Sequence, residues 1–179
     1  VGINPTRTGA LDILRLMGAD ILITNQRNVA GEPIADLTMS ACRLRGIDVP
    51  NTLVALAIDE FPILAIAAAC ADGRTSITGV GELRVKESDR ILSIVDGLRA
   101  LTIDVEETPD GMIITGGHFS GGKVDSCGDH RIAMAFALAG SVSRGPVRVM
   151  NCGLVQTSFP GFSDVARKAG LRLEVESRS

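Results

Sequence analysis

Two short stretches of this sequence combine carboxylates with basic side chains at positions where a helix should begin. They are RVKESDR at residues 84–90 and CGDHRIAMA at residues 127–135. Arg90 falls in the first turn of one expected helix, and Arg131 follows Asp129, a residue type that commonly caps helix N-termini. The positive end of the helix dipole makes an arginine there unfavourable by roughly a few tenths of a kcal/mol, unless an anion is present.

An anionic ligand would reverse the sign of that effect. Free backbone N–H groups, the helix dipole and the guanidinium group would all attract the same carboxylate or phosphate. The pattern also fits ordinary ion pairs, in which Glu87 or Asp89 binds Arg90 and Asp129 binds Arg131. The residue pattern alone leaves both interpretations open.

Two carboxylates and a lysine near these stretches are further candidates for chemistry. Asp59 opens an apolar stretch, so it is either a general base, if its pKa suits that task, or a plain helix N-cap. Glu87 stands beside Lys86 and is a second candidate for proton transfer. Lys86 alone is uninformative, because most lysines are solvated.

Helices and strands that could position these residues alternate along the chain. Hydrophobic spacing predicts helices over residues 8–17, 59–72, 87–101, 129–141 and 158–170. Strands are expected over residues 20–24, 34–39, 74–78, 103–106, 112–115, 124–126, 147–151 and 171–175. Such interleaving indicates an α/β or α+β fold. No linker interrupts residues 1–179, so a single domain is expected.

Charge and hydropathy exclude several partners. The net charge is −3 and no long basic run occurs, which argues against nucleic acid or an anionic membrane as a partner. No apolar run reaches about 18 residues, so no membrane-spanning helix is expected. The sequence also shows no signal peptide.

The four cysteines are at positions 42, 70, 127 and 152. No two of them have C-x-x-C spacing and the chain has two histidines, so no zinc or other metal site is expected. Free, mostly buried thiols in a reducing, cytoplasmic setting are the prediction.

Both stretches are parts of longer motifs that resemble a known family. LRVKESDRI at residues 83–91 and GDHRIAMAFALAG at residues 128–140 are similar to two signatures of EPSP synthases. Supporting segments occur in the same order along almost the whole chain: NPTRTG at 4–9, MGAD at 17–20, GEPIADL at 31–37, IDEFPILAIAAACADG at 58–73 and TSFPGF at 157–162.

The resemblance implies a fold and a place within a larger enzyme. EPSP synthases have two similar domains, and each is an inverted α/β barrel of three βαβαββ units with helices inside and sheets outside. The resemblance identifies residues 1–179 as the C-terminal domain, which begins at Val1 without an initiator methionine. Substrates would bind between this domain and a missing N-terminal domain. The chain is therefore expected to be inactive alone.

The resemblance also implies a reaction. The enolpyruvyl group of phosphoenolpyruvate moves to the 5-hydroxyl of shikimate 3-phosphate, and phosphate leaves through a tetrahedral intermediate without a metal or organic cofactor. Asp59 matches the family's proton acceptor, and Lys86 matches a contact to shikimate 3-phosphate. Glu87 matches the carboxylate proposed to move a proton at the methylene carbon of phosphoenolpyruvate. Arg90 and Arg131 match the pair that grips phosphoenolpyruvate.

Two departures and two alternatives accompany this resemblance. Gln156 stands near a position where some members carry a lysine that contacts phosphoenolpyruvate, and Thr102 stands where many have glycine at a helix end. A transferase acting on UDP-N-acetylglucosamine would share the fold and the chemistry, but such enzymes have a different sequence at the position of the RVKESDR motif. A non-catalytic domain that binds a partner is the other alternative.

Overall fold

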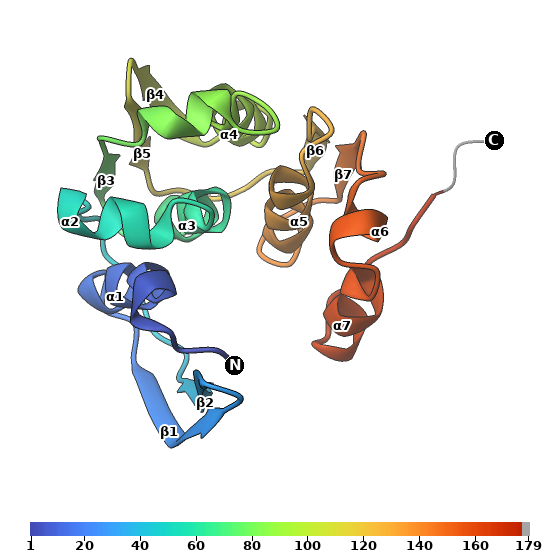
Figure 1. Ribbon diagram of the computed structural model, residues 1–179. Coiled ribbons are helices and arrows are strands. Elements are labelled where there is room, and N and C mark those ends of the chain that lie inside the picture. Colours follow the sequence, from blue (N-terminus) through green and yellow to red (C-terminus); the bar gives the residue numbers. More distant parts are fainter. Residues whose placement is uncertain (177–179) are drawn as a thin grey trace.

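The structure of the chain, a computed structural model, describes residues 1–176 (Figure 1). Its helices are α1 (Gly9–Leu16), α2 (Asn51–Val54), α3 (Phe61–Ala69), α4 (Arg90–Ala100), α5 (His130–Ala139), α6 (Val155–Ser158) and α7 (Phe162–Lys168). Its strands are β1 (Ile21–Val29), β2 (Glu32–Met39), β3 (Arg74–Ile77), β4 (Asp104–Thr108), β5 (Gly111–Thr115), β6 (Gly122–Asp125) and β7 (Val147–Met150). Short 3-10 helices are η1 (Pro5–Arg7), η2 (Ala55–Ala57) and η3 (Gly81–Val85).

The strands form three small sheets. Strands β1 and β2 form an antiparallel hairpin, β3, β5 and β4 form an antiparallel sheet in that order, and β6 pairs with β7 in parallel. The β4–β5 connection is the two-residue turn Pro109–Asp110, with Thr108 opposite Gly111. This turn confirms the hairpin predicted from the Thr-Pro-Asp-Gly sequence. The chain is therefore a mixed α/β domain.

The core lies where α1, α4 and α5 meet around α3. Helix α3 is apolar on all sides because it packs against α1, α4 and α5 (Figure 1). Helices α4 and α5 approach closely at Gly97, where an added Cβ would lie 2.3 Å from the ring of Phe136. The sheet β3–β5–β4 packs on α4, and β7 packs on α5. The contacting helices thus make up the centre of the domain, and these sheets lie against them.

The C-terminal end of α4 has an uncommon backbone. Thr102, which follows the helix, takes a φ of 66°, while Ile103 N–H donates to the carbonyl of Leu98 at 3.0 Å. This hydrogen bond is typical of a helix end that favours glycine in the left-handed conformation. A β-branched threonine in this position carries backbone strain.

Several predicted elements differ from the structure. Residues 171–175 do not form the expected strand, because no neighbouring strand in the described part of the chain pairs with them. The expected helix over 158–170 is the shorter α7, which begins after Pro160, and the preceding helix α6, which ends at Ser158, was not predicted. The first two strands are longer than predicted, because β1 continues to Val29 and β2 begins at Glu32.

The prediction of mostly buried cysteines is wrong. Cys42, Cys70, Cys127 and Cys152 are all exposed and unbridged. The interior is filled instead mainly by Ala, Val, Ile, Leu, Met and Phe side chains. Across residues 1–176, no helix is long and apolar enough to cross a membrane.

Candidate functional site

Arg90 is the first residue of α4 and is almost completely buried. Asp89 caps this helix by accepting a hydrogen bond from the backbone N–H of Leu92 (3.0 Å), as its residue type predicts. The side chain of Arg90 is 1% exposed. Its Nε donates to Asp129 Oδ2 (2.7 Å), its Nη1 donates to Asp59 Oδ1 (3.2 Å), and its Nη2 donates to Glu87. A buried guanidinium is stable here because three carboxylates surround it.

Asp129 joins the start of α5 to the start of α4. Its Oδ1 accepts from the backbone N–H groups of Arg131 (2.8 Å) and Ile132 (3.3 Å), which makes it the predicted N-cap. Its Oδ2 faces Arg90 and accepts from the hydroxyl of Ser88 at 3.4 Å. Burial alone would raise the pKa of Asp129, but the hydrogen bond from Arg90 and its charge, with the backbone donors, outweigh burial and hold that pKa below its usual range.

Arg131 reaches the same cluster from α5, with its side chain 34% exposed. Its Nη1 donates to the backbone carbonyl of Asp59 (3.1 Å), and its Nη2 donates to Asp59 Oδ2 (3.3 Å). Glu60 Oε1 lies 3.8 Å from Nη1. Burial raises the pKa of Glu60, partly offset by the charge of Arg131.

Lys86 lies on the segment that precedes α4. Its Nζ donates to Glu82 and lies 4.0 Å from Asp59 Oδ1. The hydrogen bond to Glu82 raises the pKa of Lys86, so the ammonium group stays charged at neutral pH.

Asp59 is the centre of this cluster. It lies in the turn before α3, whose N-cap is Glu60, so the interpretation of Asp59 as a plain N-cap is wrong. Its carboxylate faces Lys86, Arg90 and Arg131 instead. The structure therefore brings together all five residues singled out from the sequence, at the converging N-terminal ends of α3, α4 and α5.

The ion-pair interpretation was right for Arg90, which one of its two candidate partners binds, and wrong for Arg131. Glu87 does bind Arg90, but Asp89 binds Arg84, and the carboxylate of Asp129 binds the guanidinium of Arg90 rather than that of Arg131. Both arginines already contact carboxylates within this chain. An anionic ligand at this face would therefore compete with Asp59 and Glu87, which remain partly exposed.

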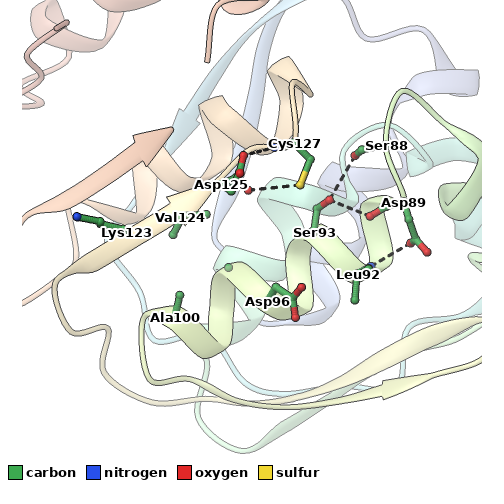
Figure 2. A pocket seen from close by; sticks show the side chains of 11 residues that line it. Ser88, Asp89, Leu92, Ser93, Asp96, Ala100, Lys123, Val124, Asp125 and Cys127 are labelled. Carbon is green, nitrogen blue, oxygen red and sulfur yellow. Dashed lines mark hydrogen bonds between the residues drawn. The ribbon is translucent and has the colours of Figure 1, made fainter. Parts of the chain in front are cut away.

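The cluster lies on an open face rather than in an enclosed cavity. A cavity of about 340 Å³ lies beside it, between α4 and the end of β6, and Figure 2 shows Ser88 and Ser93 on one side of it and Asp125 and Cys127 on the other. A second cavity, of about 460 Å³, lies beside Cys70 at the opposite end of α3 from Asp59. Among the residues that line either one, none belongs to the five predicted site residues.

Sequence reasoning missed three residues that shape the cluster. Asp129 was recognised as a cap but not as the partner of Arg90, from which 39 positions separate it. Glu60 and Arg84 were not singled out either. Arg84 belongs to the RVKESDR stretch, so its position in that motif was the available signal. In the part of the chain that the structure describes, no group of three or more His, Cys, Asp or Glu side chains could hold a metal ion.

Comparisons with known proteins point to one family. The family model for EPSP synthase (3-phosphoshikimate 1-carboxyvinyltransferase) matches residues 1–166. The chain is 59% identical over 175 residues to the 3-phosphoshikimate 1-carboxyvinyltransferase of Methylococcus capsulatus, covering 98% of this chain and 40% of that protein. It is 58% identical over 173 residues to that of Nitrosococcus oceani, covering 97% of this chain and 39% of the relative.

Solved structures agree with these relatives. An EPSP synthase structure from Acinetobacter baumannii superposes with a TM-score of 0.96 at 50% identity, covering 99% of this chain and 42% of that one. The enolpyruvyl transferase NikO from Streptomyces tendae has a TM-score of 0.57 at 17% identity, covering 92% of this chain and 35% of that one, which indicates a shared fold. The chain thus spans about 40% of the length of the curated relatives that it matches.

Proposed function

This chain belongs to the EPSP synthase family, and we propose that it supplies one side of the active site of a 3-phosphoshikimate 1-carboxyvinyltransferase. The observation that carries this proposal is the convergence of Asp59, Lys86, Glu87, Arg90 and Arg131 at three helix starts. The phosphate and carboxylate groups of phosphoenolpyruvate and shikimate 3-phosphate are suitable ligands for such a cluster, because cationic side chains and helix N-termini both attract anions.

The two arginines grip phosphoenolpyruvate in this proposal. Arg90 is held rigidly by Asp129, so its Nη atoms are presented toward Asp59 and Glu87 without a rearrangement of the helix start. Arg131 is more exposed and can exchange its contacts with Asp59 for contacts to the ligand. Phosphoenolpyruvate then replaces carboxylate contacts that already exist, which limits the desolvation that binding requires.

Two carboxylates carry the proton transfers. Asp59 accepts the proton of the 5-hydroxyl of shikimate 3-phosphate as that oxygen attacks C2 of phosphoenolpyruvate, while Lys86 contacts the same substrate. Glu87 moves the proton at the methylene carbon, first onto it for addition and then off it when phosphate leaves. One guanidinium, that of Arg90, contacts both carboxylates, which keeps the two proton-transfer groups close to each other.

The chain supplies only part of the enzyme in this proposal. The remainder of each relative, about 60% of its length, would form an N-terminal domain that faces the open cluster and encloses the substrates. We place the chain as a single C-terminal domain with the inverted α/β barrel arrangement of the family. The contacts of α3, α4 and α5 with one another support this placement. The cytoplasmic location expected from the sequence remains a prediction.

Phosphate release from phosphoenolpyruvate by a full-length protein carrying this chain tests the proposal. We expect release that depends on shikimate 3-phosphate and does not occur with UDP-N-acetylglucosamine. Release with the UDP-sugar alone would instead support the related transferase. The separate chain should be inactive, and mixing it with the purified remainder of the protein should restore turnover. Stable association without turnover would favour a non-catalytic domain.

A further inference from the structure

Lys86 and Glu87 lie on a short irregular segment between η3 and α4. Residues 86–88 belong to no helix or strand, and the preceding side chain of Val85 points outward and is 80% exposed. Such a segment has no ladder of backbone hydrogen bonds to fix its course. The positions of the two site residues therefore depend on their side-chain contacts, Lys86 with Glu82 and Glu87 with Arg90, and on how the ends of the segment are held.

Arg84 holds both ends of this segment. It is the last residue but one of η3, and its Nη1 donates to Asp89 Oδ2 at 2.8 Å. Asp89 uses its other oxygen to cap α4 through the N–H of Leu92. The ion pair between Arg84 and Asp89 thus closes a loop that contains Lys86, Glu87 and Ser88.

The same guanidinium ties the closed loop to the β4–β5 hairpin. Its Nη2 donates to Glu107 Oε1 (2.8 Å) and to the carbonyl of Thr108 (2.9 Å), and its Nε donates to the carbonyl of Pro109 (2.9 Å). Four acceptors on two chain segments, Asp89 and residues 107–109, therefore meet one planar group. Only the rigid fork of an arginine can satisfy all of them together, because a lysine ammonium is a single point.

We propose that Arg84 is a positioning residue for the reaction, which sets Lys86 and Glu87 against Asp59 and Arg90 without touching substrate itself. This inference rests on the proposed function. It also accounts for the first residue of the RVKESDR stretch, for which the substrate-binding roles give no reason. The Arg84 side chain is 27% exposed, so its purpose is not to fill the core.

The Arg84→Lys variant of the full-length protein tests this role. Lysine keeps the charge and loses the fork, so we expect kcat/KM to fall by about 10-fold to 100-fold, since a displacement of about 1 Å can have that effect. The matched control is Arg15→Lys, because Arg15 forms an exposed ion pair with Asp12 on α1. The control should keep the activity of the wild type. Unchanged activity in Arg84→Lys would overturn the inference.

A double-variant cycle separates positioning from general damage. If Arg84 acts through Glu87, then Arg84→Lys should cause little further loss in a Glu87→Gln background. A loss as large as that in the wild-type background would contradict a positioning role. Should Arg84→Lys fail to fold, Glu107→Gln can replace it, because this change removes one of the acceptors that hold Arg84. Glu107→Gln should lower kcat/KM by less than Arg84→Lys, and it should cause little further loss in the Glu87→Gln background. Losses from Glu107→Gln and Glu87→Gln that simply add would also overturn the inference.

Hydrogen exchange gives a reading that does not depend on turnover. The amide of Leu92, whose acceptor Asp89 is held by Arg84, should exchange faster in Arg84→Lys than in the wild type, while the amides of α1 should not change. An equal rate at Leu92 would refute the inference even in an active enzyme. Failure of the proposed function is recognised separately, by a wild-type protein that releases no phosphate with shikimate 3-phosphate.

Discussion

Arg90 and Arg131 begin neighbouring helices and contact the same carboxylate, yet their surroundings differ. Arg90 is 1% exposed and contacts Asp59, Glu87 and the fully buried Asp129. Arg131 is 34% exposed and contacts Asp59 and Glu60, which are both partly exposed. An arginine at the start of a helix can therefore serve two purposes in this domain. Arg90 holds the helix starts together and presents its outer nitrogens, whereas Arg131 is free to exchange partners.

The largest expected effect is on stability at the buried arginine. Arg90→Met would leave the carboxylate of Asp129 buried without its cation, and such a change costs about 3–5 kcal/mol. Arg131→Met should change the free energy of unfolding by less than about 1 kcal/mol, because partly exposed ion pairs contribute little. Urea unfolding of both variants in the full-length protein measures the difference.

A double variant sharpens this prediction. Asp129→Ser keeps a helix-capping oxygen but removes the negative charge. Combined with Arg90→Met, it should cost clearly less than the sum of the two single changes, because no buried charge is left unpaired. An additive result would show that the pair is not the source of the instability.

Acid should weaken the buried ion pair between Asp129 and Arg90. The folded pKa of Asp129 lies below the 3.8 of an ordinary aspartate, since Arg90 overcomes the effect of burial. The stability from this group is therefore complete above about pH 4 and is lost as the pH falls through its folded pKa. We expect the difference in unfolding free energy between the wild type and Asp129→Asn to narrow below about pH 4. A difference that stays constant with pH would contradict this prediction.

The opposite end of α4 offers a change that should leave the site alone. Thr102→Gly relieves a left-handed backbone conformation and should raise the free energy of unfolding by about 1 kcal/mol. Kinetic constants should not change, because Thr102 lies at the far end of the helix from Arg90. Thermal unfolding together with an activity assay checks both expectations, and a destabilised variant would disprove the first.

The smallest effect is expected on the exposed side, at Glu60. Its folded pKa is raised above 4.5, mainly by burial, so the folded state pays a small penalty once this group ionises. Glu60→Gln should therefore leave the free energy of unfolding at pH 7 unchanged or raise it by less than about 0.5 kcal/mol. The gain is small because Glu60 is partly solvated and because the substitution also removes its ion pair with Arg131. The difference should vanish below about pH 4.5. A clear loss of stability at pH 7 would show that the ion pair dominates.

Local patterns in the sequence predicted some features well. The cap Asp129 precedes α5 as expected, and the β4–β5 turn follows its Thr-Pro-Asp-Gly signal, because each depends on residues a few positions apart. Helix α4 begins at Arg90 with Asp89 as its cap, later than the expected start at residue 87. Residues 171–175 alternate like a strand but form none, since pairing requires a neighbour that no local pattern specifies.

The arrangement of the site could be predicted only in part. The types of Asp59, Arg90 and Arg131 and their places at helix starts were visible in the sequence. Their partners were not, because contacts between residues 39 or 72 positions apart depend on how the helices pack. For this reason the sequence did not show that Asp129 pairs with Arg90 rather than with Arg131. It also did not show that Arg84 pairs with Asp89 and Glu107. The catalytic and binding roles of the five residues remain predictions.

Both arginines hold phosphoenolpyruvate in the proposed function, and Arg131 does so by exchanging its contacts with Asp59 for contacts to the ligand. The most direct test is the KM for phosphoenolpyruvate of the full-length protein carrying Arg131→Met, measured with saturating shikimate 3-phosphate. Loss of charge-assisted hydrogen bonds should raise this KM by about 10-fold to 100-fold, with an unfolding free energy close to that of the wild type. An unchanged KM would contradict the account.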